Sequence, residues 1–579
     1  MGLKRLVFAC VLFFSFSFGF ATLADAAPML RLVSSTVGPI TVAAGAAGPA
    51  QIVEAYNAGD GALSLSVSSS ATWLVPTVET SRACHTTQAA STCIPLQFGL
   101  NTGSLAAGTY TATVMVKDAS PASVDAPQTI TVTVQIGSAV PSSLNVYVAP
   151  GGVNDTSFSV PSSSFSGSIT TADGNNWLSL SLTTTGSFQF SYPYRIRIAP
   201  QAGNAAGSTY TGTLVTSGSP FAGDNQTIAA TMHVTTEPVA QASPTSITAR
   251  LAQGAPTYNA YVSLANAGQG TLTATSVSAT GQGFTASLSG NLVVVKFDTG
   301  SLAPGDYPGS VTAASNAVNG SITVPIDFQV VAKGSPYIPY QGILDDAIFR
   351  AGDPVSPGDI VALFGEQLLY DTPPAPPTAP LPTTLDSVQV LVNGEAAPLY
   401  YVSYFQINFQ IPADIPAGSA TVQVKRGDGT ASNLASVEVV PRAPRLLTLD
   451  GTYGAIVNQD FSLPMPTGTF GAYPTRPAHE GDALTIYAIG LGTTTPSVAS
   501  GQPAPSNPLA NLDTMPTVVF GGGISPATAT PFFAGLTPTA SGLYQVNVFI
   551  PQGVPKGDSV SVSLVFPGSA SNPVSIAIR

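Results

Sequence analysis

Three histidines are the side chains best suited to acid–base chemistry, because imidazole titrates near neutral pH. His85, His233 and His479 are far apart in the sequence, and none of them lies in a recognisable hydrolase motif. The sequence contains no G-x-S-x-G turn, no H-E-x-x-H pair, no G-x-G-x-x-G loop and no phosphate-binding loop. We therefore expect no catalytic residues, and an enzyme with an unrecognised site is the weakest functional alternative.

Closely spaced carboxylates are the second group that could do chemistry, as the acid and base of a glycosidase or as calcium ligands. Asp345 and Asp346 are adjacent, and Asp353 and Asp359 follow shortly after. Asp359 belongs to a Gly-Asp turn that recurs at Asp482, which favours a structural role. The spacing fits no EF-hand loop, so a calcium site formed by Asp345, Asp346 and Asp353 is kept only as an alternative. We assign no metal and no cofactor.

Cys84 and Cys93 are the two cysteines that follow the N-terminal apolar segment. In an exported protein such a pair predicts a disulfide that closes a short loop. A metal site is the competing interpretation, but His85 is the one other soft ligand close by in the sequence.

Aromatic side chains could bind sugars, because their flat apolar faces stack on sugar rings. Residues 188–198 alternate aromatic or aliphatic side chains with polar ones, which is typical of the core face of a strand. Better candidates for ligand-facing aromatics are Tyr337, Tyr340, Tyr400 and Tyr401. Because adjacent residues of a strand point to opposite faces, one of the consecutive pair should face outward. An ordinary surface tyrosine is the competing interpretation for each.

Two further motifs favour structural interpretations. Arg426-Gly427-Asp428 is the integrin-binding tripeptide, but it lies between two strand-like runs, where the following Asp428-Gly429 pair predicts a hairpin turn. Six prolines within residues 373–382 predict a stiff, extended surface loop.

The composition restricts both the fold and the partners. Hydrophobic residues make up 44% and charged residues 8% of the 579 residues, against about 25% charged residues in an average soluble domain. Exposed helix faces usually carry Glu, Lys and Arg, so their scarcity favours strands and turns. The net charge is −12, and the 18 Lys and Arg are spread over the chain. A nucleic-acid partner and binding to an anionic membrane surface are therefore not expected.

The N-terminus reads as a signal peptide of residues 1–26. Lys4 and Arg5 precede an apolar run over residues 6–20, and Ala24-Asp25-Ala26 forms a cleavage motif. No later segment has 18 consecutive apolar residues, so we predict no membrane span. We expect an exported protein located outside the cell or at its surface, with the periplasm as the alternative.

Internal repeats indicate how the rest of the chain is organised. A Gly-x-Tyr turn that enters a strand occurs at Tyr110 and Tyr307, and a weaker copy, Gly207-Ser208-Thr209-Tyr210, lies between them, so that the three tyrosines are spaced 100 and 97 residues apart. The first two copies also share a Trp-Leu pair, at Trp73 and Trp177. A Trp that packs across a sandwich core would explain that recurrence. Each copy spans about 100 residues, the usual size of a sandwich domain.

The C-terminal part repeats a different pattern twice. Gln406-Ile407-Asn408 matches Gln545-Val546-Asn547, and Ser432-Asn433 matches Ser571-Asn572, both at a spacing of 139 residues. Two related domains are the simplest explanation of this constant spacing.

These repeats resemble two bacterial families. The N-terminal repeats are similar to BACON-type immunoglobulin-like modules, in their Trp-Leu pairs, Gly-x-Tyr turns and closing strands. Residues 340–579 resemble the Solibacter-type C-terminal domain of exported proteins, in the motifs Pro357-Gly358-Asp359, Gln406-Ile407-Asn408 and the segment 455–460. The resemblance implies immunoglobulin-like folds and export, and it carries no established activity.

We therefore predict an all-β chain of tandem immunoglobulin-like β-sandwich domains. After the signal peptide of residues 1–26, the predicted domains are three BACON-like sandwiches at 27–138, 139–236 and 237–334 and two TIG-like domains at 335–442 and 443–579. The expected function is a non-catalytic structural or adhesive scaffold that contacts polysaccharide or proteins of the cell surface or matrix. An array of carbohydrate-binding modules is the main alternative.

Overall fold

The computed structural model describes residues 28–59, 61–85, 92–106, 108–119, 127–183, 192–471, 473–522 and 526–579. The predicted signal peptide and Phe188 and Phe190 of the predicted aromatic strand lie outside these ranges. Within them the chain is all-β, as predicted, with strands β1 to β45 and one short 3-10 helix, Ala222–Asp224. None of the described residues forms a helix with the length and apolar character needed to cross a membrane.

The strands form five pairs of facing sheets, which we call domains 1 to 5, each around its own buried apolar cluster. In domain 1, Phe98 and Trp73 lie in the core, and burial along β9 alternates at every residue as its Ile/Val and Thr/Gln pattern predicts. One sheet contains β1 (Leu30–Leu32), β3 (Gly48–Asn57), β7 (Thr92–Leu100), β5 (Leu74–Val78) and β6 (Arg82–Ala83). The other contains β2 (Thr36–Val42), β9 (Gln128–Ile136), β8 (Gly108–Asp118) and β4 (Leu65–Ser69).

Domain 2 is built around the fully buried Trp177. The described part of the predicted aromatic strand is β14, whose Tyr194, Ile196 and Ile198 are buried as expected for the core face. One sheet contains β10 (Ser143–Val148), β16 (Thr227–Val234), β15 (Thr209–Ser217) and β12 (Ser166–Thr171). The other contains β11 (Asn154–Val160), β14 (Tyr192–Ile198) and β13 (Leu178–Leu182).

Domain 3 packs Phe284, Phe297 and Phe328 where the first two domains use a tryptophan. One sheet contains β17 (Ala240–Ser243), β19 (Tyr258–Asn266), β22 (Leu292–Phe297) and β21 (Phe284–Ser289). The other contains β18 (Ile247–Ala252), β25 (Ile322–Val331), β24 (Gly309–Ser315), β20 (Ala274–Thr280) and β23 (Gly305–Asp306).

The repeated turns of domains 2 and 3 that lead into β15 and β24 are closed by their own tyrosines, Tyr210 and Tyr307. The Tyr307 hydroxyl donates to the Ala303 carbonyl at 2.8 Å, and the Tyr210 hydroxyl accepts from the Ala205 amide at 2.8 Å. The ring therefore fixes the turn that leads into the strand, which explains why this residue recurs in the repeat.

Domains 4 and 5 each contain an asparagine that makes the same pair of hydrogen bonds to the first segment of its domain. The Asn433 side chain accepts from the Ile338 amide at 2.9 Å and donates to the Ile338 carbonyl at 3.0 Å. Asn572 makes the same pair of bonds with Leu446, at 2.8 and 3.0 Å. The repeated Ser-Asn motif thus ties a late segment of each domain to its first segment, and no such role could be assigned from the spacing alone.

Domain 4 has one sheet of β26 (Ile343–Asp345), β27 (Ile360–Phe364), β31 (Gln406–Gln410) and β30 (Leu399–Val402), and a second of β29 (Glu395–Ala396), β28 (Gln389–Val392), β32 (Gly418–Lys425) and β33 (Ala435–Val439). In domain 5 the larger sheet contains β34 (Arg445–Leu446), β36 (Ala483–Ile489), β42 (Tyr544–Phe549), β41 (Phe533–Leu536), β38 (Asn511–Leu512), β37 (Thr494–Thr495) and β35 (Ile456–Asn458). Its second sheet contains β40 (Ala527–Ala529), β39 (Thr517–Phe520), β43 (Gly557–Phe566), β44 (Ser569–Ala570) and β45 (Val574–Ile578).

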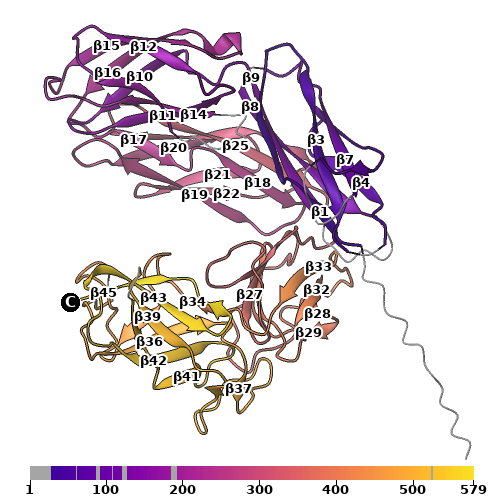
Figure 1. Cartoon of the computed structure of the whole chain (residues 1–579). Helices are drawn as coiled ribbons and strands as arrows, with labels where there is room; N and C mark the ends of the chain where they lie inside the picture. The colour runs from indigo at the N-terminus through magenta and orange to yellow at the C-terminus, as the bar shows by residue number, and fades with distance from the viewer. Residues whose placement is uncertain are drawn as a thin grey trace, which may run out of the picture.

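The domains are arranged as two arms that meet at one end (Figure 1). Domains 1 to 3 form one arm, and domains 4 and 5 form the other. Domain 1 approaches the start of domain 4, where the Arg31 guanidinium lies 6.0 Å from the centre of the Tyr340 ring. The chain therefore folds back on itself and is not an extended string of domains.

Candidate functional site at the junctions between domains

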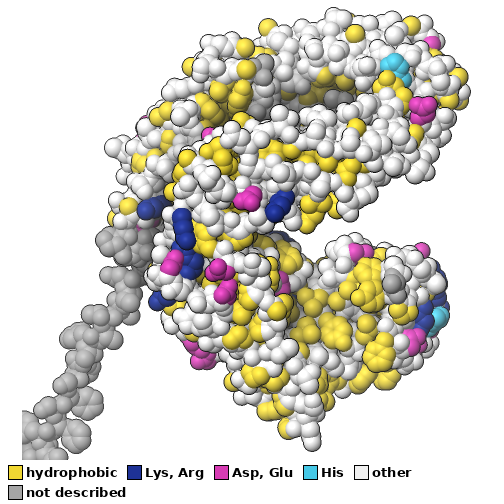
Figure 2. Space-filling view, turned by 180° about the vertical axis from the view of Figure 1, so that it is seen from behind, with side chains coloured by type: hydrophobic (Ala, Val, Ile, Leu, Met, Phe, Trp, Pro, Cys, Tyr) yellow, Lys and Arg dark blue, Asp and Glu magenta, His cyan; other side chains and the backbone are white. Residues whose placement is uncertain are grey.

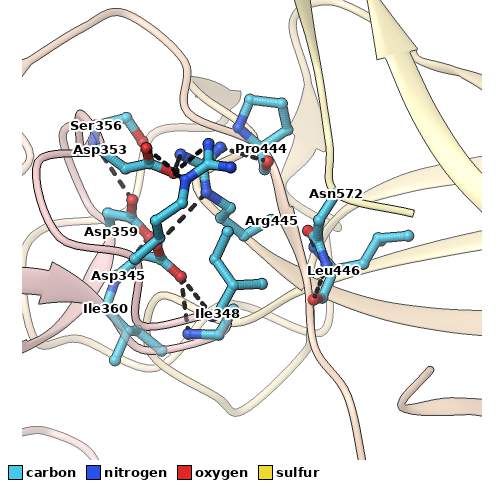
Figure 3. A network of polar contacts seen from close by, with 12 residues as sticks. Asp345, Ile348, Asp353, Ser356, Asp359, Ile360, Pro444, Arg445, Leu446 and Asn572 are labelled. Atoms are coloured by element: carbon cyan, nitrogen blue, oxygen red, sulfur yellow. Dashed lines mark hydrogen bonds and ion pairs between the residues drawn. The ribbon is translucent and has the colours of Figure 1, made fainter. Parts of the chain in front are cut away.

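A buried cluster of carboxylates joins domains 4 and 5 (Figure 3). Asp345 ends β26, Asp359 immediately precedes β27, and Arg445 begins β34 of the next domain. The Arg445 guanidinium lies 2.9 Å from the Asp353 carboxylate and 3.5 Å from that of Asp345. One cation from domain 5 is thus held between two anions from domain 4.

Burial controls the charge of this cluster. The Asp345 side chain is fully buried, and Asp359 is buried as well. Burial, together with the negative charge of Asp345, raises the pKa of Asp359 to about 8, although hydrogen bonds from the Ser356 and Ile360 amides oppose the shift. Asp359 is therefore mostly protonated at neutral pH. The cluster is closed to a substrate, and its arrangement suits a joint between domains.

The calcium alternative finds no support in the placement of its three carboxylates. One Asp345 oxygen accepts from the amides of Ala347 and Ile348, at 3.0 and 2.7 Å. The Asp346 carboxylate accepts from the Asn408 side chain at 2.9 Å, and burial raises its pKa. The Asp353 carboxylate forms ion pairs with Arg350 and Arg445. Among the described residues, no group of three or more His, Cys, Asp or Glu could hold a metal ion.

Tyr400 and Tyr401 lie on β30 near the same junction, and both are half-buried. The Tyr400 hydroxyl donates to the Ser541 carbonyl of domain 5, and burial raises the pKa of this phenol. Gln410 reinforces the contact, because its side chain accepts from the Gly501 amide at 2.6 Å and donates to the Gly358 carbonyl at 3.0 Å. The hydroxyl of Tyr400 thus serves the interface between domains.

The junction of domains 3 and 4 is also specific. Tyr404 of domain 4 packs into the apolar cluster of domain 3, and its hydroxyl accepts from the Ala252 amide at 2.7 Å. The neighbouring Phe405 lies edge-on to Tyr258 with ring centres 5.3 Å apart. Arg250 forms an ion pair with Glu366 across the same junction. These contacts join the two arms through a shared core.

Arg426 of the integrin-like tripeptide is part of this junction. Its side chain is 6% exposed. Its guanidinium donates to the carbonyls of Gln367 and Gly334, at 2.8 and 2.9 Å. Because Gly334 belongs to the linker between domains 3 and 4, Arg426 fixes that linker and does not point to solvent. The structural interpretation of the tripeptide agrees with this placement.

A cavity of about 350 Å³ lies where domain 1 meets the start of domain 4. Its lining includes Arg31, Tyr56 and Gln128 of domain 1 and Tyr340 of domain 4. Tyr337 is half-buried nearby, and burial raises its pKa while the Thr129 side chain opposes the shift. Of the four tyrosines proposed from the sequence, Tyr340 lines this cavity. Its partners could not be predicted, because they come from distant residues with no motif in common.

The predicted disulfide between Cys84 and Cys93 is present. Beside it, buried Glu54 lies 2.6 Å from Arg82 and accepts from the His85 amide at 3.0 Å. The three histidines lie in three different domains, so the structure does not bring them together. The imidazole of His233 stacks on Tyr147, and that of His479 lies 3.7 Å from Asp482.

No family model matches the chain, and no curated protein matches it. The resemblances of its two parts to BACON-type and Solibacter-type domains therefore stay predictions. Solved structures with similar folds include the Bacteroides ovatus mixed-linkage glucan utilization locus protein SGBP-B, in complex with a heptasaccharide, at 14% identity and a TM-score of 0.21. The match covers 57% of this chain and 65% of that one, so this chain spans slightly less than two thirds of that protein.

Immunoglobulin domains 1–5 of Sidekick-1 match over 96% of this chain and 100% of theirs, at 11% identity and a TM-score of 0.18. The titin fragment I67–I69 matches over 52% of this chain and 96% of its own length, at 14% identity and a TM-score of 0.14. These similarities concern the fold alone, which is an all-β array of immunoglobulin-like domains.

Proposed function

We propose that this chain is a non-catalytic exported protein that serves as a structural or adhesive scaffold outside the cell or at its surface. The observation that carries the proposal is the construction of its junctions. Domains 3, 4 and 5 are joined by buried, directional contacts centred on Tyr404, Arg426 and Arg445. Such contacts hold domains at fixed angles, whereas flexible linkers would let them move independently.

The buried charges support a mechanical role for the junction of domains 4 and 5. Removing one partner of a buried ion pair typically costs about 3–5 kcal/mol, because it leaves an uncompensated charge. If the domains separated, water would hydrate Arg445 and the carboxylates and so offset part of the lost ion pairing. Separation would, however, also break the hydrogen bonds that Gln410 and Tyr400 make across the junction. The domains are therefore expected to stay together.

Export is tested by fractionating bacterial cells that produce the full chain and sequencing the N-terminus of the product. We expect the protein outside the cytoplasm, beginning at Ala27, because Ala24-Asp25-Ala26 forms the cleavage motif. An unprocessed chain that stays in the cytoplasm would contradict the proposal. Turnover in a screen of polysaccharide, peptide and ester hydrolysis would contradict its non-catalytic part.

Carbohydrate binding is a second candidate function, favoured by the cavity next to Tyr340. Its lining combines two tyrosine rings, the Arg31 guanidinium and polar side chains such as Ser34 and Thr129. Flat rings with a few convergent polar groups are typical of ligand sites. Affinity electrophoresis in gels with soluble polysaccharides tests it: Tyr340→Ala should lose retardation, while Tyr261→Ala, an exposed tyrosine of domain 3, should keep it. Equal retardation of both variants would contradict a site in this cavity.

A further inference from the structure

Domain 5 presents two aromatic side chains that are largely exposed to solvent. Phe461 is 82% exposed and Tyr473 is 67% exposed, the two highest values among the large hydrophobic side chains that the structure describes. Both lie in the connection between β35 and β36, together with the half-buried Phe470. We call Phe461, Phe470 and Tyr473 the aromatic loop. Exposed apolar surface of this kind is costly in water and often marks a site of interaction.

The backbone of Phe461 adds a second cost. Its φ angle is +64°, in the left-handed region that suits Gly or Asn and disfavours other residues. The turn is nevertheless well held, because the Phe461 amide donates to the Asn458 carbonyl at 2.9 Å and the Ser462 amide donates to the Asp460 carboxylate at 3.1 Å. A strained, exposed ring in a fixed turn points to a function of the ring.

A polar network ties Asp460, the neighbour of Phe461 in the chain, to Arg476 and Asp482. The Arg476 guanidinium lies 2.7 Å from the Asp460 carboxylate and 2.9 Å from that of Asp482. Hydrogen bonds from the Ser462 hydroxyl and from Arg476 hold the pKa of Asp460 well below its usual range. The ion pair between Asp460 and Arg476 therefore persists at physiological pH and anchors the turn next to Phe461.

Backbone pairing joins the two chain segments that carry Phe461 and Tyr473. Leu463 and Thr475 form a parallel bridge, and the Leu463 amide donates to the Pro474 carbonyl at 2.9 Å. Phe461 and Tyr473 each lie two residues before a member of this bridge. The ring of Phe470 is 5.9 Å from that of Tyr473, centre to centre. The loop thus places a pair of packed rings, Phe470 and Tyr473, on a segment that is paired through its backbone with the segment of Phe461.

We propose that the aromatic loop is a platform on which sugar rings of a neutral polysaccharide stack. Flat aromatic faces fit the apolar faces of sugars, and Asp460, next to Phe461 in the chain, and its partner Arg476 offer acceptors and donors for hydroxyl groups. Figure 2 shows hydrophobic side chains on domain 5 close to a group of basic, acidic and histidine side chains. Two carboxylates accompany one arginine in the network, which disfavours anionic polymers and anionic lipid surfaces.

This inference rests on the proposed scaffold function, because it gives the scaffold its contact with a matrix. The test is affinity electrophoresis of the full chain in gels that contain soluble β-glucan, xylan or galactomannan, with polygalacturonate as the anionic polymer. We expect retardation by at least one neutral polymer and weaker binding, by about tenfold, in the Phe461→Ala/Tyr473→Ala variant. Phe532→Ala, another exposed phenylalanine of domain 5, is the matched control and should bind like the wild type.

A second variant separates binding from folding. Phe461→Asn suits the left-handed turn, so it should melt at the same temperature as the wild type or higher, and it should be retarded less than the wild type. No retardation of the wild type by any neutral polymer would overturn the platform but leave the scaffold proposal intact. Loss of binding in Tyr340→Ala but not in Phe461→Ala/Tyr473→Ala would also overturn it and move the site to the cavity. Retardation by polygalacturonate alone, or binding to phosphatidylglycerol vesicles alone, would overturn the chemistry proposed here.

Discussion

Asp359 and Asp482 occupy equivalent Gly-Asp turns in domains 4 and 5. The glycine amides of these turns donate to the Ile411 and Ile550 carbonyls, at 3.0 and 2.9 Å, so the backbones match closely. Their carboxyl groups do not behave alike. Burial raises the pKa of Asp359 to about 8. Burial would also raise the pKa of Asp482, but hydrogen bonds from Arg476 and the His479 amide lower it. The same repeated aspartate therefore has a raised pKa in domain 4 and a lowered pKa in domain 5.

The raised pKa of Asp359 predicts how the stability of domain 4 depends on pH. Between the unfolded value of 3.8 and the folded value of about 8, the folded state binds one more proton than the unfolded state. The free energy of unfolding should therefore fall as the pH rises from about 4 to about 8 and level off above that. Hydrogen exchange of peptides from β26 and β27, corrected for the intrinsic effect of pH, measures this change.

Asp359→Asn should remove most of this slope, because the amide does not titrate. Asp482→Asn is the matched control. A lowered pKa contributes stability above the unfolded value of 3.8 and loses it as the pH falls below that value, so this variant should keep the slope between pH 5 and 8. An unchanged slope in Asp359→Asn would show that another group titrates.

Arg445 is expected to dominate the stability of the junction between domains 4 and 5. Arg445→Met removes the cation between Asp345 and Asp353 and should cost about 3 kcal/mol, because it leaves buried carboxylates unpaired. Arg350 pairs with the same Asp353, but its side chain is 71% exposed, so Arg350→Met should cost at most about 0.5 kcal/mol. Urea unfolding of both variants provides the comparison, and equal losses would contradict the assigned role of Arg445.

At the scale of the elements, strands with regular patterns were predictable and junctions were not. The alternation in β9 and β14 gave their buried faces, since a strand places successive side chains on opposite sides. The sequence also predicted the disulfide and the structural character of the Asp359 turn. It could not predict that Arg445 meets Asp353 or that Arg31 meets Tyr340, because those contacts depend on the angles between domains. No pattern in the sequence predicted that the Phe461 side chain is exposed either.

The disulfide should stabilise domain 1 through the short loop it closes. The two cysteines are nine residues apart in the sequence, and bridges over short loops typically contribute about 2–3 kcal/mol. Cys84→Ser/Cys93→Ser should therefore unfold at lower urea concentration, as followed by the fluorescence of Trp73. The transition of domain 2, reported by Trp177, should not move. A reductant that destabilises the double variant as much as the wild type would contradict this prediction.

At the scale of the whole molecule, the contacts between domains predict that the two arms keep a fixed relation. Tyr404 inserts into the core of domain 3, Arg426 fixes the linker, and Arg445 joins domains 4 and 5. Together these contacts make a folded-back scaffold, with domain 1 against the start of domain 4 (Figure 1). A scaffold of this shape presents the aromatic loop and the cavity at defined positions.

Small-angle X-ray scattering of residues 27–579 tests whether the two arms keep this fixed relation in solution. We expect the scattering of the wild type to match the two-arm arrangement with one conformation. Tyr404→Ala, which removes the ring from the core of domain 3, should enlarge the radius of gyration, whereas Tyr261→Ala should leave it unchanged. A wild-type profile that fits only a broad ensemble of extended, independently moving domains would contradict the account.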